Sequence, residues 1–276
     1  MIAEATAFRG HLQLEAAPRP GGRTMLARQS FRAPFHIGKP YWDCGVLQVR
    51  VVNPTAGILG GDHLELAVRV RSGAALLLTT PAATRAFAMR AGASALCRQS
   101  FAVEAGGWLE YAPEPLFPHG GSDYKQITRI DAADGAELYW VDALAPGRAG
   151  RGERWAWARL KLGLDVVHGG EPVLIERLAA SGAELAARAA FFGQPEAWFA
   201  TAVALSPLLE GDEVFWDRVR ALHRNGCRLG ATRLRRGGWV IRVVAPGALA
   251  LRESLAELRA LLAEKLPGLR SDLRRL

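Results

Sequence analysis

The 276-residue chain is half hydrophobic and 22% charged, a composition that supports a folded core and excludes disorder over most of its length. Its formal net charge of +8 permits contact with an acidic protein, a nucleic acid or an anionic membrane. The arginines are scattered and do not form a stripe with interleaved aromatic residues. We therefore expect no nucleic-acid partner, and a basic nucleic-acid-binding β protein stays an alternative.

Targeting signals and metal-binding cysteine motifs are missing from the sequence. No segment is apolar over the length needed to cross a bilayer, and the first residues lack the pattern of a secretory signal. We expect a cytoplasmic protein with no membrane partner. Cys44, Cys97 and Cys227 lie far apart, so each is predicted to be a small buried hydrophobe and not part of a disulfide framework. The sequence shows no internal repeat.

Short β-type segments fill the first two thirds of the chain. Apolar and polar residues alternate over 45–53 and 63–71, which predicts half-buried strands. The continuous apolar run at 74–80, "AALLLTT", predicts a strand that is buried on both faces.

Three further pairs of β-type segments flank glycine-containing turns. The turns lie at Gly106-Gly107, Asp134-Gly135 and Gly237-Gly238. Glycine adopts the positive φ angles of tight turns without a steric penalty. The three turns therefore predict three antiparallel hairpins.

Helical patterns come late in the chain. Asp212 is predicted to cap a helix that runs to Asn225-Gly226, and a leucine stripe predicts a second helix over 250–266. Residues 184–205 stay ambiguous between helix and strand. The fold expected over residues 1–276 is a single, mainly β domain of antiparallel strands and hairpins, with a few helices toward the C-terminus.

The segment "NPTAGILGGDHLEL", residues 53–66, resembles a phosphate-binding loop only in its glycine content. A P-loop requires lysine and then serine or threonine, and a dinucleotide fingerprint requires a following helix, whereas Asp62-His63 lead into a strand. A tight turn in which Asp62 hydrogen-bonds the backbone is the structural alternative. Asp62 and His63 would point to opposite faces of the strand, so they are not expected to chelate one ion together.

No catalytic constellation is evident. The histidines are isolated, and the sequence shows no residue that would orient a catalytic base. A hydrolase that uses Asp62 with His119 or His63 stays an alternative. His119, flanked by turn residues, is expected to be exposed. Carboxylates occur in apolar strand contexts, and each taken alone is expected to face the surface; they are Asp62, Glu110, Asp142 and Glu176.

Four segments together resemble the UreD (UreH) family of urease accessory proteins, in their order and in their spacing. They are "GILGGD" at 57–62, "TTPAATRAF" at 79–87, "LEYAPEPLFPHGGSDYKQITRID" at 109–131 and "LYWVDALAPGRAGRGE" at 138–153. The C-terminal "PGLRSDLRRL" departs from the proline-rich, tryptophan-containing tail usual in this family. The departure affects only the contacts that the tail would make, and not the identification. The likeness extends from about Phe8 into the C-terminal leucine helix.

The resemblance implies a non-enzymatic, β-rich scaffold. Such proteins join a helical UreF-type partner and a UreG-type GTPase to the urease apoprotein and help deliver nickel to its active site. No tightly bound cofactor is implied, only Ni²⁺ in transit through an internal polar passage.

Oxygen ligands suit such a passage, because imidazole and thiolate would hold nickel more persistently. The resemblance places six residues along it, with Glu110 and Glu153 as further candidates. The six are Asp62, Thr79, Thr80, Thr84, Asp142 and Glu176.

Overall fold

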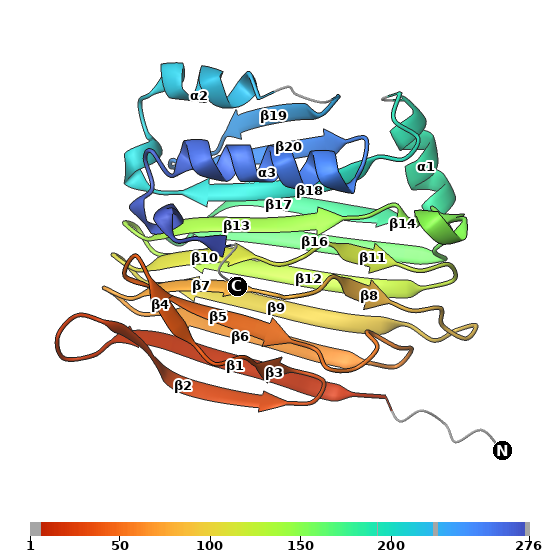
Figure 1. Ribbon diagram of the computed structural model, residues 1–276, viewed down its shortest axis with the longest axis horizontal. Helices are drawn as coiled ribbons and strands as arrows, with labels where there is room; N and C mark the ends of the chain where they lie inside the picture. Colours follow the sequence, from red (N-terminus) through yellow and green to blue (C-terminus); the bar gives the residue numbers. More distant parts are fainter. Residues whose placement is uncertain (1–6, 192, 223–225, 274–276) are drawn as a thin grey trace.

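The computed structural model describes residues 7–191, 193–222 and 226–273. Two large β-sheets, one of seven strands and one of eleven, pack face to face in this part of the chain (Figure 1). The protein is mainly β, as predicted, and its α-helices come after the first seventeen strands of the described residues. No helix in the described ranges is long and apolar enough to cross a bilayer.

The seven-stranded sheet runs, in spatial order, β17 (Glu171–Ala180), β16 (Arg159–His168), β12 (Asp123–Ala132), β9 (Ala95–Val103), β6 (His63–Val70), β1 (Arg9–Pro18) and β2 (Thr24–Arg32). The main path of the eleven-stranded sheet runs β19 (Arg228–Arg233), β20 (Trp239–Ala245), β18 (Trp198–Leu205), β13 (Glu137–Leu144), β10 (Trp108–Ala112), β7 (Ala75–Thr79), β5 (Val46–Val52) and β3 (His36–Ile37). Three short strands join its sides: β4 (Tyr41–Asp43), β8 (Thr84–Ala86) and β11 (Leu116–Pro118). A separate two-stranded sheet pairs β14 (Gly147–Arg148) with β15 (Glu153–Arg154).

The helices are α1 (Gly182–Phe191), α2 (Glu213–Arg220) and α3 (Ala248–Leu262), with short 3₁₀ turns η1 (Ala149–Arg151), η2 (Pro207–Leu209) and η3 (Pro267–Arg270). α1 and β18 resolve the ambiguous segment into a helix followed by a strand. Asp212 caps α2, because its carboxylate accepts a hydrogen bond from Phe215 N at 2.9 Å. α2 ends at Arg220, before the predicted stop, and Asn225 lies outside the described residues.

From β5 to β16 the chain winds as a solenoid. The long strands alternate between the sheets: β5, β7, β10 and β13 belong to the eleven-stranded sheet, and β6, β9, β12 and β16 to the seven-stranded sheet. Neighbours within each of these sets are parallel. Antiparallel pairs occur toward the two ends of the sheets, for example β1 with β2 and β13 with β18.

The predicted hairpins at Gly106-Gly107 and Asp134-Gly135 are therefore wrong. Gly106 and Gly135 have the positive φ expected of tight turns, 70° and 76°. Each turn, however, carries the chain across to the opposite sheet, and the turns stack: Gly73 N donates to Gly106 O at 3.1 Å and Gly106 N to Gly135 O at 2.9 Å. The turn at Gly237-Gly238 does join an antiparallel pair, β19 and β20, as predicted.

The stacked turns reveal a structural repetition, although the sequence shows no internal repeat. Gly73, Gly106 and Gly135 mark equivalent points of successive coils, roughly 30 residues apart, which is within the range of solenoid repeats. Repetition of a glycine turn between alternating strands is thus the signal of this winding.

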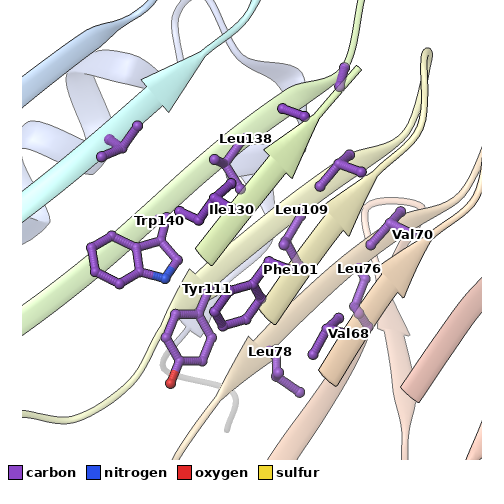
Figure 2. Packing of buried hydrophobic residues seen from close by; sticks show 14 of the residues in the cluster. Val68, Val70, Leu76, Leu78, Phe101, Leu109, Tyr111, Ile130, Leu138 and Trp140 are labelled. Atoms are coloured by element: carbon purple, nitrogen blue, oxygen red, sulfur yellow. The ribbon is translucent and has the colours of Figure 1, made fainter. Parts of the chain in front are cut away.

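The eleven-stranded sheet is covered on both faces. Leu76 and Leu78 of β7 face the seven-stranded sheet (Figure 2), whereas Leu77 packs in the cluster that includes the buried leucines of α3. All three leucines are 0% exposed, which confirms the strand predicted to be buried on both faces. The seven-stranded sheet instead shows alternating buried and accessible residues, because only one of its faces packs on the other sheet.

The cysteines follow the prediction in two of three cases. Cys97 and Cys227 are buried, but Cys44 is exposed. Cys44 adopts a φ of 48° at the turn between β4 and β5, next to Gly45. The short turn keeps its side chain outside the core.

Candidate functional site

The space between the sheets is apolar over one part of the strands and polar over the next. On β12 the inward-facing residues are Tyr124, Gln126 and Thr128, followed by Ile130 in the hydrophobic cluster. On β9, Gln99 occupies the same inward row one strand away, opposite Thr128. Buried polar side chains such as these require partners or water.

The facing sheet contributes a carboxylate to this polar zone. Asp142 on β13 stands next to Thr201 on β18 as a cross-strand pair. Gln126 Nε2 donates to Asp142 Oδ2 at 2.7 Å, so this hydrogen bond joins the two sheets. Gln126 Oε1 in turn accepts from Tyr124 Oη at 3.1 Å, and Thr128 Oγ1 donates to Gln99 Oε1 at 3.2 Å.

Burial raises the pKa of the Asp142 carboxyl to about 7, although the hydrogen bonds from Gln126 and from the Ala143 amide oppose the shift. Asp142 keeps some accessible surface because it lines a cavity. It therefore meets that cavity as a poorly solvated carboxylate, for which a cation would be a favourable neighbour.

Two cavities border this hydrogen-bonded group. The larger, of 490 Å³, is lined by Thr128, Asp142 and Thr201 and by Glu176 and Arg242. The smaller, of 140 Å³, is lined by Thr80, Thr84, Gln99 and Tyr124, among others. Of the residues that the structure describes, Gln126 alone lines both.

An ion pair between the two sheets borders the larger cavity. Arg242 on β20 donates through Nε to Glu176 Oε1 on β17 at 2.8 Å. The side chains are partly exposed, 50% for Arg242 and 25% for Glu176. Glu176 therefore stands between solvent and the interior, within the same cavity lining as Asp142.

The smaller cavity is bordered by the segment that contains Thr80 and Thr84. Thr80 Oγ1 accepts from Glu114 N at 2.9 Å. Gly57, on the other side, has a φ of 148°, and a Cβ there would lie 2.5 Å from Arg85 O. Glycine at this position lets the 57–62 turn approach β8 closely, so it shapes the wall of the cavity.

The other predicted site residues lie outside both cavity linings. Asp62 is 2% exposed, and its two oxygens accept from Phe8 N and Leu59 N, each at 2.8 Å. Asp62 therefore hydrogen-bonds the backbone of its own turn and of Phe8, as expected for the alternative in which it has a structural role. Thr79 donates to Ala112 O at 2.6 Å on the face of β7 that points away from the seven-stranded sheet.

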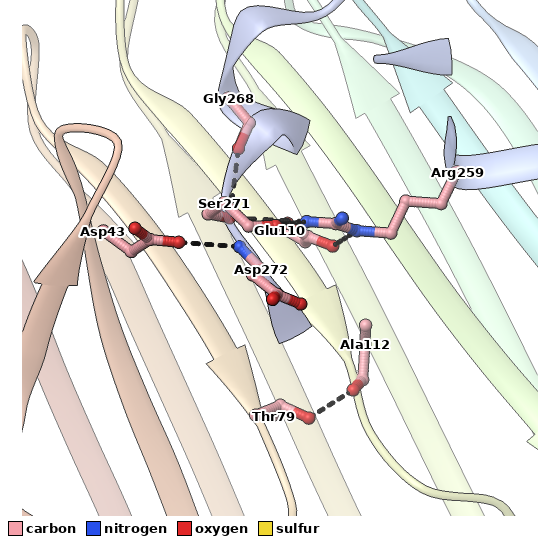
Figure 3. A network of polar contacts seen from close by, with 8 residues as sticks. All are labelled: Asp43, Thr79, Glu110, Ala112, Arg259, Gly268, Ser271 and Asp272. Atoms are coloured by element: carbon pink, nitrogen blue, oxygen red, sulfur yellow. Dashed lines mark hydrogen bonds and ion pairs between the residues drawn. The ribbon is translucent and has the colours of Figure 1, made fainter. Parts of the chain in front are cut away.

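Glu110 also lies on that outer face (Figure 3). It is 0% exposed and pairs with Arg259 of α3 through two hydrogen bonds, of 2.6 Å to Oε1 and 2.8 Å to Oε2. Arg259 also reaches Ser271 O at 2.9 Å, which ties the C-terminal segment to the sheet. Burial raises the pKa of Glu110, and the Arg259 guanidinium counters this shift.

Glu153 lies at the edge of β15 and pairs with Arg148, while it also accepts from Gly120 N at 3.1 Å. The neighbouring His119 is 3% exposed, so the expectation that it is exposed is wrong. Its ring packs against Phe87 at 4.6 Å, and burial lowers its pKa. The turn that contains His119 folds back against β8, which a local turn pattern cannot reveal.

The hydrolase alternative gains no support from this geometry. The hydrogen bonds of Asp62 come from backbone amides, and His63 Nε2 lies 2.6 Å from Arg98 Nη1. Among the described residues no cluster of three or more histidine, cysteine, aspartate or glutamate side chains could hold a metal ion.

Sequence reasoning singled out Asp142, Glu176, Thr80 and Thr84 but missed Gln126, Gln99, Thr128 and Thr201. The missed signal was the phase of the strands, that is, which alternate residues of each strand point into the space between the sheets. Gln126 and Thr128 share the inward phase of Ile130, and Gln99 shares that of Phe101. Polar residues in a buried phase indicate an internal polar zone.

Comparison with known proteins identifies the family. The family model of the UreD urease accessory protein matches residues 8–276. The chain is 52% identical over 272 residues to the urease accessory protein UreD of Opitutus terrae, covering 98% of this chain and 99% of that protein. It is 34% identical over 264 residues to the urease accessory protein UreD of Alkalilimnicola ehrlichii, covering 95% of this chain and 88% of that protein. The chain belongs to the UreD family of urease accessory proteins.

Proposed function

We propose that this protein serves in urease maturation as a non-enzymatic scaffold that conducts Ni²⁺ between its two sheets. The passage would run from the Thr80–Thr84 side of the smaller cavity, past Gln126, to the Glu176 side of the larger cavity. Gln126 carries this proposal because it lines both cavities and so links them within one polar zone.

The chemistry of the lining fits transport of a divalent cation. Carboxylate, amide and hydroxyl oxygens bind nickel less persistently than imidazole or thiolate does. Asp142 and Glu176 supply carboxylate oxygens, of which those of Glu176 are shared with Arg242, and Gln99, Gln126, Thr128 and Thr201 supply neutral oxygens. Cys97 also lines the smaller cavity, but burial raises the pKa of its thiol to about 11, so it stays protonated and is a poor nickel ligand at neutral pH.

The proposal assigns different roles to the predicted site residues. Thr80, Thr84, Asp142 and Glu176 border the passage. The remaining four support the architecture around it through the hydrogen bonds described above; they are Asp62, Thr79, Glu110 and Glu153.

The partners expected for this scaffold are UreF-type and UreG-type accessory proteins and the urease apoprotein. Their participation follows from family membership and is part of the proposal. Nucleotide chemistry is assigned to the UreG-type partner, because the glycine turn at 57–62 packs on β8 and leads into a strand.

Replacing Asp142 or Asp62 by leucine tests the passage. Asp142→Leu removes an oxygen ligand and imposes a desolvation cost on the cation, so nickel per urease active site is expected to fall at least tenfold with the accessory complex still assembled. Asp62→Leu leaves two backbone amides without their acceptor, which is expected to lower the free energy of unfolding by about 1–3 kcal/mol and to weaken assembly as well.

Three measurements separate these effects: nickel per urease active site, recovery of the assembled complex, and melting temperature. Normal nickel loading by Asp142→Leu in an intact complex would end the assignment of Asp142 to a passage.

A further inference from the structure

The amide of Gln126 occupies the junction between the two cavities. Gln126 is 7% exposed, and both ends of its amide are engaged. Nε2 donates to Asp142 Oδ2 across the sheets, and Oε1 accepts from Tyr124 Oη on its own strand. The nitrogen end of the amide therefore faces the carboxylate that a cation would seek.

We infer that Gln126 is the selectivity gate of the passage and that its amide turns over to let a divalent cation move from one cavity to the other. This inference rests on the proposed function. The sequence motifs did not single out Gln126, and a passage alone does not require that its amide turn over.

The hydrogen bonds explain why the gate is closed without a cation. The two N–H groups of a glutamine amide are donors and its oxygen is an acceptor. In the observed orientation the donor end satisfies Asp142. With Asp142 ionised, turning the amide over would place Oε1 against its carboxylate, and two acceptors would then face each other in a poorly solvated site.

A divalent cation reverses this preference. Placed between Gln126 Oε1 and the Asp142 carboxylate, it would be bound by both oxygens, as amide and carboxylate oxygens bind divalent cations elsewhere. Tyr124 Oη could then accept from the displaced Nε2, because a phenol oxygen both donates and accepts. Neutral molecules and anions offer no such compensation, so the gate would respond to positive charge.

Two substitutions at Gln126 probe the gate in the assembled accessory complex. Gln126→Met keeps the length but removes the amide, so nickel loading of urease is expected to fall about tenfold. Gln126→Glu places two carboxylates at the junction, and the complex is expected to retain nickel through gel filtration while it loads urease more slowly. Gln48→Met is the matched control, because Gln48 is also a buried glutamine, 0% exposed, but lies outside both cavity linings.

The measurements are nickel retained by the complex, nickel per urease active site and melting temperature. Each is made with Ni²⁺ alone and with Mg²⁺ added as a competing ion. Loading defects specific to Gln126, at unchanged melting temperature, support the gate. If Asp142→Leu blocks loading while both Gln126 variants load normally, the gate is wrong and the passage stands. If Asp142→Leu and both Gln126 variants load normally, the passage itself is wrong. Equal defects in Gln126→Met and Gln48→Met would also overturn the gate, since loss of a buried amide outside the passage would then have the same effect.

Discussion

Burial of the Asp142 carboxyl couples the stability of the protein to pH. Its pKa is about 7 in the folded protein against an ordinary value of 3.8, so between these values the unfolded chain loses the proton and the folded chain keeps it. Raising the pH through this window therefore lowers the free energy of unfolding. Each unit of pKa shift corresponds to about 1.4 kcal/mol.

Asp142→Asn should remove this dependence, because asparagine does not titrate. Urea unfolding at pH 5 and pH 8 is expected to show the variant gaining stability over the wild type as the pH rises, with the gain levelling off above pH 7. Parallel curves for the two proteins would show that Asp142 ionises as readily in the folded chain as in the unfolded one.

At the scale of elements, the buried pair of Arg259 and Glu110 fixes α3 and the C-terminal segment on the eleven-stranded sheet (Figure 3). Arg259→Met would leave Glu110 buried without its partner, at an expected cost of about 3–5 kcal/mol in the free energy of unfolding. The double variant Glu110→Leu, Arg259→Met removes both charges and should recover much of this loss.

The exposed pair of Arg218 on α2 and Glu264, just after α3, provides a control, because its side chains are 53% and 49% exposed. Arg218→Met should cost less than about 1 kcal/mol. Urea unfolding of the wild type and of these three variants checks both expectations. A loss in the double variant as large as in Arg259→Met would mean that packing of the arginine side chain, and not the buried charge, is what stabilises the contact.

Elements and their connections differ in how far the sequence predicts them. The strands over 63–70 and 75–79 and the helix α3 follow from periodicity, since burial of one face or both faces leaves a direct pattern in the residues. The connections at Gly106 and Gly135 were misassigned because a positive φ reverses the chain whether the next strand lies beside the first or across from it. Stacking on neighbouring turns decides between these two positions of the next strand. The neighbouring turns come from distant parts of the chain, so a local sequence pattern does not reveal the stacking.

At the scale of the whole molecule, the later part of the chain exposes large apolar side chains. Val214 on α2 is 75% exposed and Leu249 on α3 is 68% exposed. Exposed apolar residues on helices are candidates for contact with a helical partner of the UreF type. We expect Val214→Asp and Leu249→Asp to weaken that contact at least tenfold while leaving the fold intact.

Met25→Asp is a suitable control, because Met25 is 39% exposed on β2, at the opposite edge of the molecule from α2 (Figure 1). Binding of the purified partner can be measured by titration, with melting temperature as the check on folding. Unchanged affinity in both helix variants would place the partner on another surface.

The sequence by itself determined the strand content, the late helices and the membership of a family, because these depend on local periodicity, caps and motifs in a fixed order. It also drew attention to Asp142 and Glu176 through those motifs. The tertiary structure decided which carboxylates meet a cavity: Asp62 bonds backbone amides, Glu110 bonds Arg259 on the outer face, and Asp142 faces Gln126 between the sheets. The solenoid winding makes this choice, since it sets which strand lies opposite which, and that pairing depends on residues far apart in the chain.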